Sequence, residues 1–298
     1  MYQALYRKWR PQTFADVIGQ QHITDTLRAQ LQSGRLSHAY LFTGTRGTGK
    51  TTCAKILARA VNCEHPVNGD PCNECAACRG ILDGSVLDVT EIDAASNNGV
   101  DNIRDLRDET RYTPAQVRKR VFIIDEVHML SIGAFNALLK TLEEPPEHVL
   151  FILATTELHK VPATILSRCQ RFDFRRIGAE DISRRLLDVA AGEGIALTEG
   201  AARLIARLAD GAMRDALSML DRAAAAGAVD EKTVTAALGV MGQDDGIRLA
   251  EHLKTGDLAA AVGLLDEYYN AGRDLASVYD QMLGLIRDAL LVKTSKTD

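Results

Sequence analysis

Residues 44–52 read Gly44-Thr45-Arg46-Gly47-Thr48-Gly49-Lys50-Thr51-Thr52 and match the pattern Gly-x-x-x-x-Gly-Lys-Ser/Thr. The apolar run Ala39-Tyr40-Leu41-Phe42 precedes this pattern, and a helical stretch over residues 53–61 follows it. A glycine-rich loop between a strand and a helix turns backbone N–H groups toward phosphate oxygens, and the helix N-terminus adds positive potential. The sequence therefore predicts an ATP-binding loop, with Lys50 at the β- and γ-phosphates and Thr51 on Mg²⁺.

A pair of carboxylates, Asp125 and Glu126, ends the apolar run over residues 121–124. Beside a phosphate loop, one such carboxylate holds the hydration shell of Mg²⁺ and a second deprotonates the attacking water. We assign Asp125 to the metal, together with Thr51, and Glu126 to the proton. Either Thr155 or Thr156, which follow the next apolar run, could place a hydroxyl on the water or the γ-phosphate; we take Thr155 as the catalytic candidate.

The first 178 residues alternate short apolar runs with helical patterns, which predicts a parallel α/β sheet. The expected strands are 39–42, 86–89, 121–124, 149–153 and a short 172–174. A helix over 134–144 is expected to end before the two prolines that follow it.

Beyond residue 178 the strand signal disappears and apolar residues follow helical spacing. Thr198 is the expected N-cap of a helix that runs to residue 208. A gap over 239–245 then precedes helices at 246–254, 257–270 and 273–293. We predict three domains: an α/β domain over 1–178, a small helical domain over 179–242, and a further helical domain over 243–298 that looks truncated.

The composition is that of an ordinary globular protein, with 46% hydrophobic and 25% charged residues. The longest apolar run is far shorter than the ~20 residues of a membrane helix, and the N-terminus lacks a secretory signal, so we expect a cytoplasmic protein. Charge is uneven: Lys and Arg number 22 against 20 acidic residues up to position 178, and 13 against 20 beyond it. Any nucleic acid is therefore expected to contact a local patch of the first domain.

Four of the six cysteines, Cys63, Cys72, Cys75 and Cys78, lie close together in an insertion at about 62–80. In a cytosolic chain this spacing favours a metal site over disulfides. Tetrahedral Zn²⁺ is preferred to an iron–sulfur cluster because no Cys-Pro pair follows the run. Four thiolates leave no open position, so the zinc is predicted to be structural; His65 is an alternative to the first cysteine. The two isolated cysteines, at 53 and 169, are expected to be buried and inert.

Together these motifs resemble the gamma/tau family of AAA+ clamp-loader ATPases from bacterial DNA polymerase III. The resemblance spans about residues 1–240, includes the zinc insertion between the first two strands, and rests on these further segments: Tyr6-Arg7-Lys8-Trp9-Arg10-Pro11, Phe14, Val17-Ile18-Gly19-Gln20, Glu91-Ile92-Asp93-Ala94-Ala95-Ser96, Ile124-Asp125-Glu126-Val127-His128-Met129-Leu130, residues 136–146, Ser167-Arg168-Cys169 and Gly211-Ala212-Met213-Arg214-Asp215-Ala216. Residues 246–298 match only loosely.

The resemblance implies further site residues. The segment from Tyr6 to Ile18, called the N-terminal strip below, would lie along the adenine. Its candidate contacts are Tyr6, Arg7, Pro11, Val17 and Ile18. Arg214 would reach the phosphates of its own nucleotide, and Arg168 would act in trans as an arginine finger on the nucleotide of a neighbouring subunit. A helix cap for Arg168 and a surface charge for Arg214 are the alternatives. Arg104 is a candidate DNA-phosphate contact.

The implied function is ATP-driven opening of a ring-shaped sliding clamp and its loading onto primed DNA during replication. The implied partners are the delta and delta-prime subunits, further gamma/tau copies, the clamp and the DNA, with ATP, Mg²⁺ and structural Zn²⁺ as cofactors. Two alternatives stay open: a non-hydrolysing scaffold subunit of the clamp loader, and another AAA+ motor acting on DNA. The complete phosphate loop and its carboxylates argue against the scaffold, and the zinc insertion argues against the other motor.

Overall fold

The computed structural model describes residues 2–225, 227–240, 243–270 and 275–295. Its contacts divide the chain into two compact units, one formed by residues 1–182 with 210–215 and the other by residues 183–209 with 216–298. Among the described residues, every helix is either too short or insufficiently apolar to span a lipid bilayer.

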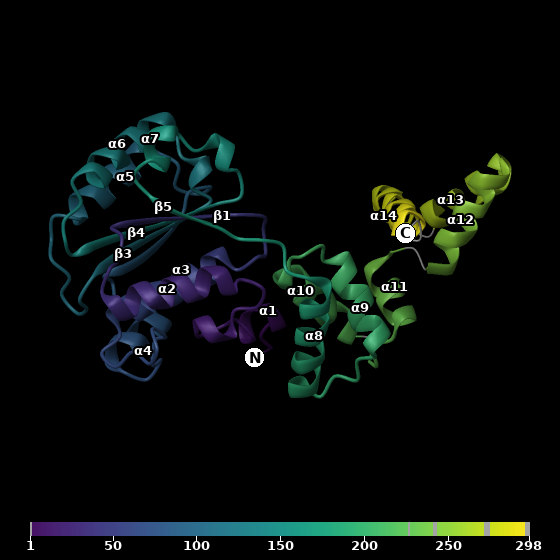
Figure 1. The fold of residues 1–298 in the computed structure, drawn as a ribbon, viewed down its shortest axis with the longest axis horizontal. Helices are drawn as coiled ribbons and strands as arrows, with labels where there is room; N and C mark the ends of the chain where they lie inside the picture. The colour runs from purple at the N-terminus through teal and green to yellow at the C-terminus, as the bar shows by residue number, and fades with distance from the viewer. Residues whose placement is uncertain (1, 226, 241–242, 271–274, 296–298) are drawn as a thin grey trace. The chain divides into compact units, whose positions relative to one another are not determined.

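A five-stranded sheet forms the centre of the first unit (Figure 1). Its strands are β1 Ala39–Thr43, β2 Val89–Asp93, β3 Arg120–Asp125, β4 Val149–Thr155 and β5 Gln170–Asp173. Every pairing is parallel, and the strand order is β2-β3-β4-β1-β5. The predicted parallel α/β sheet is therefore confirmed.

Helices cover both faces of the sheet because side chains alternate along each strand. Tyr40 and Phe42 of β1 pack into a core with α2 Gln21–Ser33 and α3 Lys50–Asn62. Ala39 and Leu41 belong to the core on the opposite face, which α5, α6 and α7 cover (Figure 1). The bounds of these and of the short helices of the first unit are α1 Leu5–Lys8, η1 Phe14–Asp16, α4 Ala76–Asp83, α5 Val100–Glu109, η2 Val127–Met129, α6 Ile132–Glu143, η3 Leu158–Lys160 and α7 Ala163–Leu166.

The sheet register brings the carboxyl ends of four strands to one edge. Thr43 pairs with Thr155, and Asp93 pairs with Asp125. In an open parallel sheet, ligands bind outside this edge, which is also where the loop after β1 begins.

Two strands lie at positions that differ from the predicted ones. The predicted strand 86–89 is wrong, because only Val89 of it belongs to β2. Val86 is buried against Gly80, and Asp88 turns its carboxylate inward, so neither residue continues the strand. The short fifth strand occupies Gln170–Asp173 rather than 172–174.

The remaining helices follow the expected pattern closely. They are α8 Ala179–Glu193, α9 Glu199–Leu208, α10 Met213–Ala224, α11 Glu231–Leu238, α12 Gln243–Thr255, α13 Leu258–Asn270 and α14 Leu275–Ser295. Thr198 caps α9 as predicted, its hydroxyl accepting a hydrogen bond from the Ala201 N–H at 3.2 Å. The predicted gap over 239–245 is too long, since α12 begins at Gln243, and the predicted start of the last helix at 273 lies outside the described residues. Side chains of α12, α13 and α14 share a small core of their own.

Asp88 stabilises the connection into β3. Its carboxylate accepts hydrogen bonds from the N–H groups of Ala115 and Gln116, both at 2.9 Å, and pairs with Arg120 at 2.8 Å. Burial alone would raise the pKa of this carboxyl, but the two N–H groups and the guanidinium outweigh burial, and the pKa lies below its ordinary value.

A lowered pKa in the folded state means that Asp88 contributes stability at neutral pH and loses it as the pH falls below about 4. We expect Asp88→Asn to lower the free energy of unfolding by about 1–3 kcal/mol at pH 7, with the deficit shrinking toward pH 3. Urea denaturation at a series of pH values measures this difference. The matched control is Asp101→Asn, which changes an exposed carboxylate on α5 and is expected to leave stability nearly unchanged. A deficit that stays constant with pH would contradict the assigned role.

Candidate functional site

The phosphate loop joins β1 to α3 and has the backbone shape that phosphate binding needs. Gly44, Gly47 and Gly49 have φ values of 143°, 79° and 105°, a region that favours glycine. A Cβ added at Gly47 would come 2.7 Å from the Cβ of Ala212. This position therefore requires glycine for space as well as for conformation.

Lys50 lies at the first turn of α3 with its ammonium turned back into the loop. Its Nζ donates to the carbonyl oxygens of Gly44 at 2.8 Å and Thr45 at 2.9 Å. Burial lowers the pKa of Lys50, whereas the nearby carboxylates of Glu126 and Asp125 act in the opposite direction. The ammonium is thus held on the inner side of the loop, where a polyphosphate would be cradled.

Thr51 and Asp125 meet although they lie far apart in the sequence. The Thr51 hydroxyl donates to Oδ2 of Asp125 at 2.7 Å, and the Glu126 N–H donates to Oδ1 at 3.0 Å. A hydroxyl and a carboxylate on neighbouring elements are the oxygen donors that Mg²⁺ takes alongside water and phosphate. These two residues fit the magnesium role predicted for them.

Glu126 follows β3 in a left-handed conformation with φ 48°. Its Oε2 accepts hydrogen bonds from the N–H of Thr156 at 3.3 Å and from the Thr156 hydroxyl at 3.0 Å. The structure therefore distinguishes the two adjacent threonines: Thr156 contacts the proposed base, whereas the hydroxyl of Thr155 faces His128.

His128 is a site residue to which the sequence analysis gave no role. The ring is buried; its Nδ1 lies 3.0 Å from the Thr155 hydroxyl and 3.5 Å from Oε2 of Glu126, and its Nε2 lies 3.2 Å from Oε1 of Glu157. The Thr155 hydroxyl also accepts from the Glu157 N–H. With the imidazole proton on Nε2, that nitrogen donates to Glu157 and the Thr155 hydroxyl donates to Nδ1, so the approach of Nδ1 to Glu126 is then a contact without a hydrogen bond. The position of His128, two residues after Glu126, was the available sequence signal.

The N-terminal strip lies against the phosphate loop. Val17 is buried, and the fully buried Gln20 beyond it donates from Nε2 to the carbonyl oxygens of Arg175 at 2.7 Å and Thr48 at 3.4 Å. At the other end of the strip, the Arg214 guanidinium carbon lies 4.9 Å from the ring centroid of Tyr6. The fold therefore places the Arg214 guanidinium over Tyr6, at the start of the strip. Gln20 is a positioning residue that the sequence analysis quoted without assigning it a role.

Arg168 makes its contacts within this chain. Its Nη1 donates to the carbonyl oxygen of Thr164 at 2.8 Å, and its Nη2 pairs with Oε1 of Glu143 at 2.6 Å. The contact with Thr164 is the helix cap that the sequence analysis gave as the alternative role of Arg168. Glu143, at the end of α6, is a partner that the sequence did not suggest.

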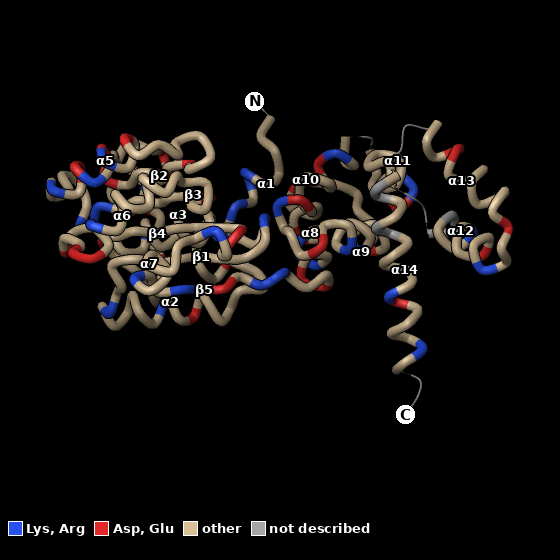
Figure 2. Tube along the Cα trace, turned by 90° about the horizontal axis from the view of Figure 1, so that it is seen from above, with Lys and Arg blue, Asp and Glu red and all other residues tan. Residues whose placement is uncertain are grey.

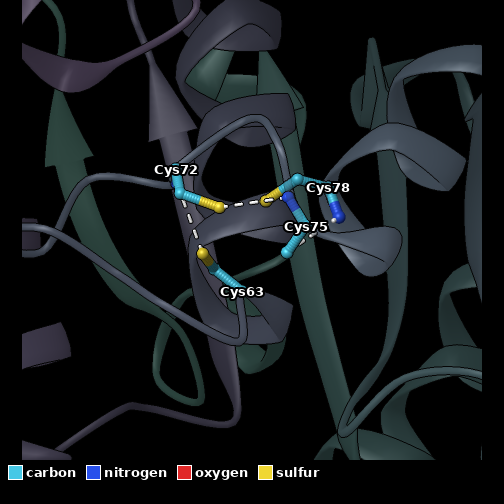
Figure 3. A group of neighbouring side chains, drawn as sticks. All are labelled: Cys63, Cys72, Cys75 and Cys78. Atoms are coloured by element: carbon cyan, nitrogen blue, oxygen red, sulfur yellow. Dashed lines mark hydrogen bonds between the residues drawn. The ribbon is translucent and has the colours of Figure 1, made fainter.

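The four clustered cysteines converge as predicted (Figure 3). All their sulfur atoms lie within 4.8 Å of one another, and all are free thiols. Backbone N–H groups of Cys72, Cys75 and Cys78 donate to the sulfurs of Cys63, Cys72 and Cys75 at 3.3–3.4 Å. This arrangement is compatible with a tetrahedral zinc site. His65 is exposed and lies outside the group.

The two isolated cysteines lie in apolar surroundings. Cys53 is buried in the core beside the sheet, as expected. The expected burial is wrong for Cys169, which packs against the edge of the other core and is only half-buried. Burial raises the pKa of each thiol to about 12. Both thiols are therefore protonated at neutral pH, in agreement with the expected inert role.

Arg104 is exposed on α5 and pairs with Asp101 at 2.8 Å. Basic and acidic positions stand side by side along this helix (Figure 2). Local charge at Arg104 is thus partly neutralised by its own helix.

A parallel sheet with a phosphate loop after β1 and paired carboxylates after β3 defines a P-loop nucleotide-binding module of the AAA+ class. Solved structures agree: RuvB from Thermotoga maritima, a Holliday junction branch migration motor, aligns over 93% of this chain and 91% of its own with a TM-score of 0.60. At 17% identity this likeness shows the fold alone.

Family models and curated relatives give the particular family. The models match residues 19–178 (DNA polymerase III, delta subunit), 181–229 (clamp loader subunit, ATPase lid domain) and 229–298 (subunits gamma and tau, domain III). The DNA polymerase III tau subunit of Bacillus subtilis is 55% identical over 99% of this chain and 53% of its own length; that of Escherichia coli is 47% identical over 99% and 46%. The gamma subunit of Buchnera aphidicola is 43% identical, with 95% of this chain and 79% of its own covered.

This chain belongs to the gamma/tau subunit family of bacterial DNA polymerase III, as its motifs had indicated. It spans about half the length of the first two relatives.

Proposed function

We propose that this chain is an ATP-hydrolysing motor subunit of the DNA polymerase III clamp loader. In this role it uses ATP to open the sliding clamp and to load it onto primed DNA at replication forks. The observation that carries the proposal is the hydrogen bond between Thr51 and Asp125, with Glu126 held beside it by Thr156. A non-hydrolysing scaffold would not need this complete set of groups.

Each group of the site has a distinct task. The N–H groups of residues 44–52 and the Lys50 ammonium bind the phosphates, while Thr51 and Asp125 hold Mg²⁺, which offsets phosphate charge when it is bound. Glu126 accepts the proton of the attacking water. Thr156 positions the Glu126 carboxylate, and Thr155 acts behind it through His128.

Two arginines are proposed to contact nucleotide phosphates, one in its own chain and one in a neighbouring subunit. Arg214, over the Tyr6 ring, serves the nucleotide of its own chain next to Arg7, Pro11, Val17 and Ile18. Arg168 serves the nucleotide of a neighbouring subunit, for which its guanidinium exchanges Glu143 and Thr164 for phosphate oxygens. An ion pair at a half-exposed surface is weak enough for this exchange, since such pairs contribute about 0–1 kcal/mol.

The proposed partners are the delta and delta-prime subunits, further gamma/tau copies, the sliding clamp and primed DNA. The nearly balanced charge of residues 1–178 favours a few local phosphate contacts, Arg104 among them, over a continuous basic channel. The protein would work in the cytoplasm, at the nucleoid.

The four-cysteine cluster is proposed to hold one structural Zn²⁺. Four thiolates complete the tetrahedral coordination of zinc, so no position is left for a substrate. The insertion that carries the cysteines would thus be cross-linked by the metal rather than by a large core.

Lys50→Ala is expected to abolish ATP binding, because the loop loses the charge that neutralises phosphate. Glu126→Gln is expected to retain ATP affinity but to lose turnover, because an amide cannot accept the proton. Equilibrium binding and steady-state ATPase assays measure the two effects, with Glu109→Gln, at an exposed carboxylate at the end of α5, as the control. Wild-type affinity in the Lys50 variant would contradict the phosphate-loop assignment.

Elemental analysis is expected to find one zinc and negligible iron per chain. Cys75→Ser should lose the zinc, because three ligands bind it far less tightly than four, whereas Cys53→Ser should retain it. Iron with visible absorbance would show that the metal assignment is wrong. The insertion is expected to lose its local order without zinc, because zinc binding contributes on the order of 10 kcal/mol to the folding of small metal-folded units.

Arg168→Ala is expected to leave the ATP affinity of the isolated chain unchanged and to lower turnover of the reconstituted assembly by roughly 10³-fold or more. Mixing Arg168→Ala and Glu126→Gln chains should restore part of the turnover, because some interfaces then pair an intact Glu126 with an intact Arg168. Arg171→Ala is the matched control, since Arg171 is also exposed and paired within the chain. An equal loss of turnover in a strictly monomeric chain would show that Arg168 acts in cis.

A further inference from the structure

The loop between Cys63 and Cys72 is anchored on the N-terminal part of the chain through Asp70. One carboxylate oxygen accepts a hydrogen bond from the backbone N–H of Phe14 at 2.5 Å, and the other pairs with Arg28 of α2 at 2.6 Å. The Asp70 side chain is only 13% exposed, so both contacts are shielded from water. Phe14, which donates one of these two contacts, is itself buried in the core.

A second contact joins the insertion to the same place. The Gln12 carbonyl oxygen accepts from Nδ2 of Asn73 at 3.2 Å and from Nη2 of Arg59 at 2.8 Å. Asn73 lies between Cys72 and Cys75 and has a φ of 60°, so the fold of the cysteine cluster sets its direction. Arg59 comes from α3, the helix that begins at the phosphate loop.

The backbone of the insertion also lies close to the backbone of α2. A Cβ added at Gly69 would lie 2.9 Å from the Cα and the carbonyl oxygen of Arg28. The insertion is therefore packed onto α2 and the N-terminal strip rather than standing free of the domain.

These contacts hold the middle of the strip, while Gln20 holds its end against the phosphate loop. We infer that the cysteine insertion positions the adenine-facing strip, with Asp70 as the positioning residue, so that retention of the metal and recognition of the base are coupled. The inference rests on the proposed function, because the role of the strip at the base belongs to that proposal.

The coupling has a simple physical form. When the insertion loses its fold, residues 12–14 lose two hydrogen-bond partners at once, Asp70 and Asn73, and the strip occupies its binding-competent position for a smaller fraction of the time. The apparent affinity for ATP falls by that fraction. The phosphate loop is held by β1 and α3 and keeps its shape, so binding of the triphosphate moiety alone is not affected.

The test compares ATP with inorganic tripolyphosphate, which lacks the base, by titration calorimetry on the zinc-loaded chain. Asp70→Ala is expected to weaken ATP binding by about 3- to 10-fold and to leave tripolyphosphate binding unchanged. The control is Glu64→Ala, which removes an exposed carboxylate from the same loop. Asp70→Asn keeps an acceptor for Phe14 but loses the charge, and its effect is expected to be intermediate.

Trp9, the only tryptophan of the chain, provides a readout without nucleotide. It lies in the strip, directly after α1. Acrylamide quenching of its fluorescence is expected to increase in Asp70→Ala, and equally when zinc is removed from the wild-type chain by a chelator, but not in Glu64→Ala.

Two results would overturn the inference: unchanged ATP affinity in Asp70→Ala, or an equal loss of ATP and tripolyphosphate affinity, which would mean that the insertion supports the whole domain. Failure of the underlying proposal for the strip gives a different result, because a wild-type chain whose strip does not contact the base would bind ATP no more tightly than tripolyphosphate.

Discussion

The hydrogen bond between the Thr51 hydroxyl and the Asp125 carboxylate joins the two halves of the nucleotide site. It is possible because parallel strands end at a common edge, which places the start of α3 next to the end of β3. Lys50, Glu126 and Thr156 are arranged around this bond. Any shift of β3 against β1 and its loop would separate the proposed phosphate-binding groups from Glu126, the proposed proton acceptor.

A second group of residues lies next to this edge and is expected to have no direct contact with the nucleotide. His128 spans from the Glu126 carboxylate to Glu157, and the segment after Glu157 leads through η3 and α7 to Arg168. Glu126, the proposed base for one nucleotide, is thus linked through His128 to the start of the segment that carries the proposed finger for another. On the other side, the cysteine insertion and Gln20 hold the N-terminal strip at two points. The site is therefore supported from both directions by polar contacts between distant segments.

The amount that sequence could predict differed between parts of the molecule. The phosphate loop, the carboxylate pair and the four cysteines are local patterns, and the described structure brings each of them together. The strand expected at 86–89 was wrong because apolar character alone does not show that Asp88 turns inward to bind Ala115, Gln116 and Arg120. The choice between Thr155 and Thr156 could not be made either, because adjacent residues at a strand end differ only in the side on which they emerge.

The sequence by itself determined the class of fold, the phosphate-binding chemistry and the metal-binding potential of the cysteines, since each depends on residue types at short, fixed spacings. Only the tertiary structure decided which distant groups meet: Thr156 with Glu126, Arg168 with Glu143, and Asp70 with Phe14 and Arg28. These partners are separated by many residues and lie on different elements. Their contacts depend on how helices pack on the sheet and on the path of each loop, and no local pattern in the chain encodes either one.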